Sequence, residues 1–126
     1  MGLGYIEKMS EQKIYDLEER TFQFAKKVRF FIQKIPKSIA NNEDAKQLVR
    51  ASGSVAANYI EANEKLSDKD FDFRIKVCKK EAKESGLWLR LIKETNELDE
   101  VNFIEDLINE SIELRKIFNA ILKKRE

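Results

Sequence analysis

Residues 71–92 read FDFRIKVCKKEAKESGLWLRLI and carry the clearest pattern in the chain. Apolar or small side chains recur there at alternating steps of four and three residues. They are Phe71, Ile75, Cys78, Ala82, Ser85, Leu89 and Ile92. This spacing keeps the side chains on one side of an α-helix, as in the contact seam of a helical bundle. The pattern predicts a long helix that begins at Ser67 or Asp68, ends near Thr95 and packs one stripe against other helices.

Three further segments show the same periodicity. The first covers about residues 16–35 and ends before Pro36, because the residue before a proline disfavours the helical conformation. The second begins near Asn42, a plausible N-cap, and the fourth helix of the chain begins at Asn102, which forms a capping-box pattern with Glu105. Four helices joined by short connections predict an all-α fold, an antiparallel up-down four-helix bundle.

Length and composition agree with a single helical domain. The chain has 126 residues, 42% of them hydrophobic and 37% charged, with four glycines and one proline. This composition is too apolar for a disordered chain and favours helices over turn-rich β structure. We expect the bundle to occupy residues 15–126, after an N-terminal extension of residues 1–14 that is poorly ordered and has no role in the fold.

The chain lacks the residues that most enzymes and metal sites use. It contains no histidine and one cysteine, Cys78, so an internal disulfide, a histidine-activated nucleophile and a histidine-based metal site are excluded. Cys78 lies on the apolar stripe and is expected to be a small core residue. No apolar run approaches the roughly 18 residues of a membrane span, so we expect a cytoplasmic protein without a membrane partner. We expect no catalytic residue, metal or cofactor, and an enzyme is the least favoured class.

A second apolar row lies beside the stripe of residues 71–92. It consists of Phe73, Val77, Trp88 and Leu91. Two interpretations are open: another subunit covers this row, or the helix is wide and fully buried within one chain. Exposed aromatic side chains are typical of interface cores, so we favour an oligomer interface.

Basic residues are unevenly distributed, although the net charge is only +1. Five basic residues and no acid lie between Thr21 and Asn42, and seven basic residues but two acids lie between Phe73 and Lys93. Such helix faces can neutralise phosphates and release counterions, so we expect RNA or DNA as a partner. The predicted nucleic-acid-binding residues are Lys26, Lys27, Lys34, Lys76, Lys80, Lys83 and Arg90. The alternative is that these side chains form an ordinary solvated surface.

Residues 47–62 read QLVRASGSVAANYIEA and place four polar side chains on one helix face. These are Arg50, Ser54, Asn58 and Glu61. The segment resembles the helix-two signature of the bacterial 23S rRNA intervening-sequence proteins, also called four-helix bundle proteins. The resemblance extends over about residues 15–123, with one departure, because Ala62 stands where the family usually has glycine.

The resemblance implies a homo-oligomer, often a ring-like pentamer, with no established enzymatic activity. The fold is also similar to that of the accessory variability protein of diversity-generating retroelements, a basic pentamer that binds nucleic acid and a reverse transcriptase. Two functional hypotheses remain open. One is an oligomer that binds structured RNA through a basic face of the first and third helices. The other is a protein-interaction scaffold or a reverse-transcriptase accessory protein.

Overall fold

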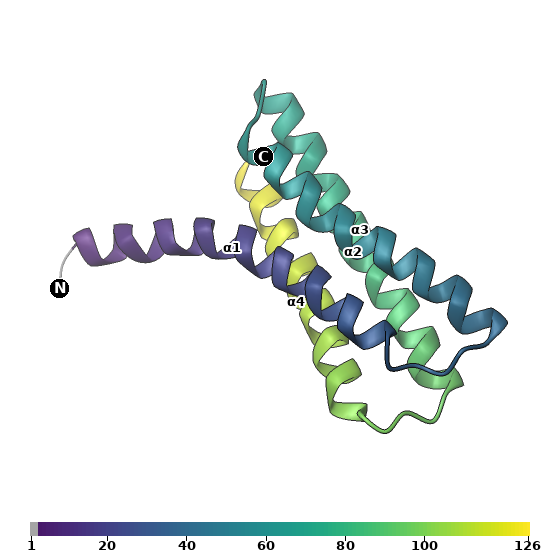
Figure 1. Ribbon diagram of the computed structural model, residues 1–126. Coiled ribbons are helices and arrows are strands. Elements are labelled where there is room, and N and C mark those ends of the chain that lie inside the picture. The colour runs from purple at the N-terminus through teal and green to yellow at the C-terminus, as the bar shows by residue number, and fades with distance from the viewer. Residues whose placement is uncertain (1–2) are drawn as a thin grey trace.

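The computed structural model describes the backbone of residues 3–126 and the side chains from Leu17 onward. It consists of four α-helices, α1 (Leu3–Ile32), α2 (Ile39–Asn63), α3 (Asp68–Thr95) and α4 (Val101–Lys124), with no strand among these residues (Figure 1). The predicted all-α four-helix bundle is confirmed. None of the described helices has both the length and the apolar character that a membrane span requires.

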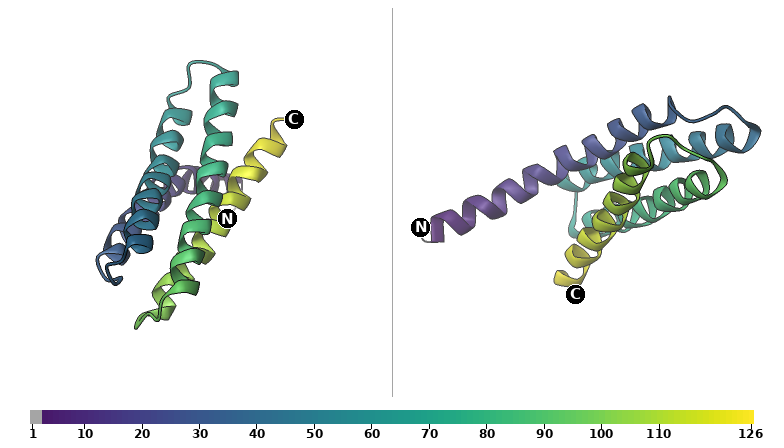
Figure 2. Two further views of the ribbon diagram at one scale, coloured as in Figure 1. Left: turned by 90° about the vertical axis from the view of Figure 1, so that its right-hand side faces the viewer. Right: turned by 90° about the horizontal axis from the view of Figure 1, so that it is seen from below.

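Each helix packs against two others. α3 lies between α2 and α4 (Figure 2), and α1 contacts α2 and α4, so α1 and α3 occupy opposite corners of the bundle. The α2–α3 and α3–α4 pairs have long contacts, whereas α1 meets α4 over a much shorter stretch. The α1–α4 side is therefore the least closely packed.

The apolar stripe of α3 lies at the centre of the core. Six of its seven positions are buried, from Ile75 to Ile92, and Phe71 is partly buried against the same cluster. The other helices contribute Phe24, Val28, Leu48, Val55, Tyr59, Ile104, Leu114 and Phe118. A four-three spacing in the sequence therefore identifies the buried side of α3 correctly.

Two expected helix starts are wrong. α2 begins at Ile39, where the Ser38 side chain accepts a hydrogen bond of 3.0 Å from the backbone N–H of Asn41, so the cap lies one turn before Asn42. α4 begins at Val101 without a side-chain cap, so the Asn102 capping box does not form. The expected start of α3 is confirmed, because the helix begins at Asp68. The Ser67 side chain caps it and accepts a hydrogen bond of 3.0 Å from the backbone N–H of Asp70.

The limits of α1 also differ from the expectation. The helix begins at Leu3 rather than near residue 16 and ends at Ile32, three residues before Ile35. Residues 1–2, and the side chains of residues 3–16, lie outside what the structure describes. A separate, poorly ordered extension of residues 1–14 therefore stays a prediction.

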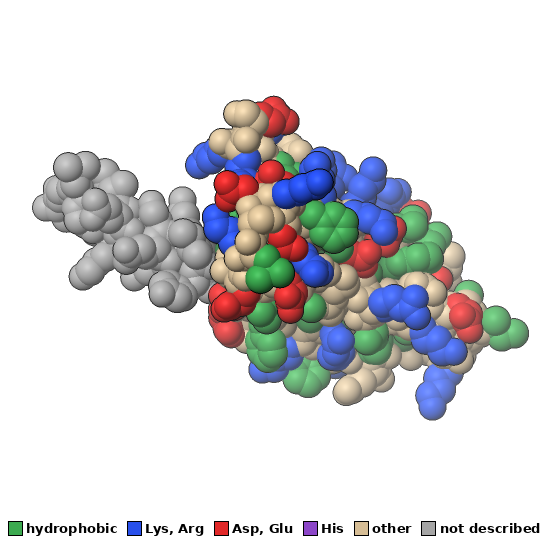
Figure 3. All heavy atoms as spheres, turned by 90° about the horizontal axis from the view of Figure 1, so that it is seen from above, with side chains coloured by type: hydrophobic (Ala, Val, Ile, Leu, Met, Phe, Trp, Pro, Cys, Tyr) green, Lys and Arg blue, Asp and Glu red, His purple; other side chains and the backbone are tan. Residues whose placement is uncertain are grey.

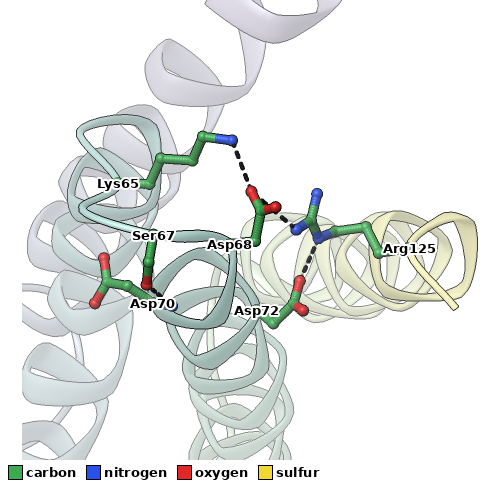
Figure 4. A network of polar contacts seen from close by, with 6 residues as sticks. All are labelled: Lys65, Ser67, Asp68, Asp70, Asp72 and Arg125. Carbon is green, nitrogen blue, oxygen red and sulfur yellow. Dashed lines mark hydrogen bonds and ion pairs between the residues drawn. The ribbon is translucent and has the colours of Figure 1, made fainter.

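A group of charged side chains joins the start of α3 to the end of α4 (Figure 4). Arg125 bonds to Asp72, lies 3.6 Å from Asp68 and stacks its guanidinium 4.6 Å from the centre of the Phe71 ring. Lys65 donates a hydrogen bond of 3.1 Å to Asp68 and lowers the pKa of that carboxyl. These contacts hold the last turn of α4 on the bundle.

Candidate nucleic-acid interface

A groove of about 710 Å³ runs between α3 and α4. Its floor contains the small residues Ala82, Gly86 and Ser111, and apolar side chains such as Leu87 and Ile112 line its walls. Leu87 and Ile112 are 48% and 41% exposed. The groove is therefore a shallow apolar channel that is open to solvent.

Gly86 allows the two helices to approach at this point. A Cβ atom on Gly86 would lie 2.9 Å from Ser111 Oγ, closer than such atoms pack. The Ser111 hydroxyl is itself turned to its own helix, where it donates a hydrogen bond of 2.6 Å to the Ile108 carbonyl. The floor of the groove is thus set by the missing side chain of Gly86.

Basic side chains surround this channel. Lys80, Lys83 and Arg90 come from α3 and Arg115 from α4, with Glu84 as an acidic neighbour. Lys80 lies 3.8 Å from Glu81 Oε1, whereas the other three cations form no ion pair with any carboxylate in the described part of the chain. The charges of Lys83, Arg90 and Arg115 are therefore available to an anionic ligand.

The structure brings together three of the seven predicted nucleic-acid-binding residues at this groove, Lys80, Lys83 and Arg90. Lys76 is exposed on α3 one turn before Lys80 but does not line the groove. Arg115 was not identified from the sequence, because its place opposite α3 depends on how α3 and α4 pack. Its sequence position gives little indication, because Arg115 and Lys116 follow four acidic residues of the same helix.

The other three predicted lysines, Lys26 and Lys27 of α1 and Lys34 of the α1–α2 connection, lie on a different part of the molecule. Lys26 is exposed beside Phe30, and Lys27 lines a second groove, between α1 and α4. Lys34 is engaged within the chain, 3.0 Å from Glu100 and 5.5 Å from the centre of the Phe103 ring. Since α1 and α3 do not pack side by side in the described part of the chain, the basic residues form two surfaces rather than one shared face.

The predicted interface row on α3 is divided. Phe73 and Leu91 are 58% and 40% exposed, whereas Val77 and Trp88 are partly buried and Trp88 packs against the core. The alternative of a fully buried helix is therefore wrong for Phe73 and Leu91 within a single chain.

The family of this bundle follows from its similarity to known proteins. The profile of the 23S rRNA-intervening sequence protein family matches residues 12–120, most of the chain. The chain belongs to this family. The fold also resembles a solved protein of unknown function from the S23 ribosomal protein family of Bacteroides thetaiotaomicron. The two chains are 25% identical with a TM-score of 0.74, over 85% of this chain and 98% of the other. No match was found among curated proteins.

In this 23S rRNA-intervening sequence protein, the signature residue Asn58 links α2 to α3, and Ser54 holds its side chain in place. Asn58 donates hydrogen bonds to the Ser54 carbonyl and hydroxyl oxygens at 2.9 and 3.0 Å, and accepts one of 3.1 Å from Arg74 Nη1. Arg74 Nε lies 3.7 Å from Asp70 and is buried without a hydrogen bond. Arg50 and Glu61 remain exposed. Ser54 and Asn58 therefore have a structural role in this family member.

Cys78 is the core residue that the sequence predicts. Its thiol is buried, with Sγ 3.5 Å from the Val55 carbonyl oxygen, and burial raises its pKa to about 12. The thiol is protonated at neutral pH and is a poor nucleophile.

Proposed function

We propose that this member of the 23S rRNA-intervening sequence proteins is a non-enzymatic, homo-oligomeric protein that binds structured RNA at the α3–α4 groove. The observation that carries the proposal is the position of Lys83, Arg90 and Arg115 around one groove with no carboxylate partner in the described part of the chain. Cations that are not neutralised within the protein gain most from neutralising phosphates, since they release counterions without breaking an ion pair.

The dimensions of the groove suit a phosphate backbone. Residues 80 to 90 of α3 extend about 15 Å along the helix axis, at about 1.5 Å per residue. A duplex strand presents a phosphate about every 3.4 Å of axis, so several phosphates lie within reach of this row. Arg115 faces the row from α4, and its guanidinium can bind two phosphate oxygens at once.

Attraction at this groove would be local rather than a property of the whole protein. The net charge is +1, and the face drawn in Figure 3 shows basic and acidic side chains interspersed, with neither sign covering it. We therefore expect a modest number of phosphate contacts per chain and binding that depends on the groove residues individually.

The test compares two variants with the same change in charge. In one, Lys83, Arg90 and Arg115 are replaced by Glu; in the control, the exposed Lys46, Lys69 and Lys123 are replaced by Glu. Fluorescence anisotropy with a labelled RNA hairpin should show a loss of roughly 10²-fold in affinity for the groove variant and a much smaller loss for the control. Equal losses in both variants, or none in either, would refute a localised site.

A second candidate is a protein-interaction scaffold, favoured by the exposed Phe73 and Leu91. This face would hold the ring-like pentamer that the family resemblance implies, or a protein partner such as a reverse transcriptase. Replacing Phe73 and Leu91 by Glu should then reduce the mass in solution, measured by light scattering, while the helical circular dichroism stays unchanged. A partner held this way should be insensitive to salt, unlike RNA.

A further inference from the structure

The solvent-facing side of α1 carries two aromatic rings with a cation between them. Phe22, Lys26 and Phe30 follow one another at four-residue steps, so they lie on the same side of the helix. Phe22 is 54% and Phe30 48% exposed, and Lys26 Nζ lies 5.9 Å from the centre of the Phe30 ring. We call these three residues the aromatic stripe. It lies on α1, the corner of the bundle opposite α3.

The charge along the aromatic stripe is positive from Phe22 onward, whereas Glu18 and Glu19 lie one turn before Phe22. Lys27 and Arg29 flank it, and neither they nor Lys26 form an ion pair with a carboxylate in the described part of the chain. The sequence between Thr21 and Asn42 contains no acid. Two exposed phenylalanines beside three available cations are unusual for a surface that meets only solvent.

Arg29 is held in place beside the stripe by contacts with the protein. Its Nη1 donates a hydrogen bond of 2.9 Å to the Ala25 carbonyl oxygen. Its Nη2 lies against α2 at Gly53, where a Cβ atom would be only 3.1 Å away. Gly53 therefore leaves room for a guanidinium that lies across the α1–α2 contact, positioned before any ligand arrives.

We propose that the aromatic stripe binds unpaired bases of a single-stranded nucleic acid, with Lys26, Lys27 and Arg29 contacting its phosphates. The inference deepens the proposed function, on which it rests, by adding a contact for single strands to the groove for structured RNA. Every base has a π-face that stacks on an aromatic ring, and single-strand-binding surfaces combine such rings with cations. The rings are about 12 Å apart along the helix axis, so the ligand is a strand of several nucleotides.

Two other ligands of the aromatic stripe, a second copy of this chain and a continuous duplex, fit its cations and rings less well. Two copies of this chain that met through the stripe would bring Lys26, Lys27 and Arg29 of each copy together, and like charges across an interface are unfavourable. A continuous duplex keeps its bases stacked on one another, so the rings could not reach their faces. A single strand satisfies both the rings and the cations.

The experiment uses the full chain and two labelled RNAs, an unstructured 12-nucleotide oligo-U and a closed hairpin. In the test variant Phe22 and Phe30 are replaced by Leu, which keeps the apolar area but removes the aromatic faces. The control replaces Ile39 and Leu66, two exposed apolar side chains outside α1 and outside the predicted oligomer interface, by Ala. The test variant should bind oligo-U about tenfold or more weakly per ring lost, with unchanged hairpin affinity, unchanged mass and unchanged helical content. The control should bind both RNAs as the wild type does.

Three results would overturn the inference. In the first, the wild-type protein does not bind oligo-U at low salt. In the second, the variant with Phe22 and Phe30 replaced by Leu keeps its oligo-U affinity. In the third, this variant loses oligo-U affinity and also has a lower mass in solution. The last would make a second copy the occupant of the stripe. The groove variant, with Lys83, Arg90 and Arg115 replaced, separates the two proposals. If this variant keeps its hairpin affinity while the stripe variant loses oligo-U affinity, the groove proposal is refuted and the stripe proposal is supported.

Discussion

The two grooves beside α4 have similar sizes but differ in whether their arginines form ion pairs within the chain. The α1–α4 groove, of about 880 Å³, is bridged by Arg20, which donates hydrogen bonds of 2.8 and 2.7 Å to the two Glu110 carboxylate oxygens. In the α3–α4 groove, of about 710 Å³, Lys83, Arg90 and Arg115 lack such partners in the described part of the chain. The Arg20–Glu110 pair joins α1 to α4, whereas the unpaired cations of the α3–α4 groove are the residues that the proposed function assigns to RNA.

The most disruptive test would give the α3–α4 groove the internal partner that the α1–α4 groove has. Ile112 lines the groove and is 41% exposed, so Ile112→Glu places a carboxylate among the three cations at little cost to folding. RNA affinity should fall by at least about tenfold. Ile112→Gln, similar in size but neutral, is the control, and a similar loss in both would mean that shape rather than charge governs binding.

Breaking the bridge of the other groove should affect stability instead. Arg20→Met removes a two-bond ion pair whose side chains are 34% and 27% exposed, and leaves Glu110 partly buried without it. The free energy of unfolding, measured by urea denaturation, should fall by about 1 kcal/mol. RNA affinity should not change, and a parallel loss of affinity would show that the two grooves do not differ in role.

The floor of the α3–α4 groove gives a smaller and more specific effect. Gly86→Ala gains helix propensity, worth about 1 kcal/mol, but brings Cβ against Ser111 Oγ. In a Ser111→Ala background the clash disappears, so Gly86→Ala should raise the free energy of unfolding by about 1 kcal/mol. In the wild-type background the same substitution should raise it by less. Urea denaturation of the four proteins in a double-mutant cycle measures this coupling. Additive effects would mean that Ser111 does not limit the approach of α3 and α4.

The smallest effect concerns Glu81, whose carboxylate lies 3.8 Å from Lys80. Burial raises the pKa of this carboxyl, with help from Glu84 and against the opposing charges of Lys80 and Arg50. The folded state therefore binds the Glu81 proton more tightly than the unfolded state does. Protonation of Glu81 favours the folded state at low pH, and this gain in the free energy of unfolding is lost as pH rises through the folded-state pKa. Glu81→Gln should remove that pH dependence and raise stability at pH 7 by less than about 1 kcal/mol. A stability gain confined to low pH would contradict this sign.

The sequence predicts the fold best where one stripe repeats without interruption. The four-three spacing of α3 identifies six buried residues, because periodicity follows directly from helix geometry. The sequence predicts helix ends less well, because several neighbouring polar residues could each serve as the N-cap. Ser38 caps α2 one turn before Asn42, and the neighbouring Asn41 is buried, bonded at 2.8 Å to Asn96.

The candidate sites depend on information that no single segment contains. The sequence identifies Lys80, Lys83 and Arg90 as basic, but their convergence with Arg115 requires α3 and α4 to be neighbours. The same holds for Arg29 over Gly53, which needs the contact of α1 with α2. The order of helices around the bundle is the missing element, since it also separates the lysines of α1 from those of α3.

The most direct test of the central claim, that the unpaired cations of the α3–α4 groove bind phosphate, is the salt dependence of hairpin RNA binding. Three phosphate contacts per chain predict that the logarithm of the affinity falls with the logarithm of salt concentration with a slope of about −3. The variant with Lys83, Arg90 and Arg115 replaced by Glu should lose most of that slope. A wild-type slope near zero, or an unchanged slope in the variant, would contradict the claim.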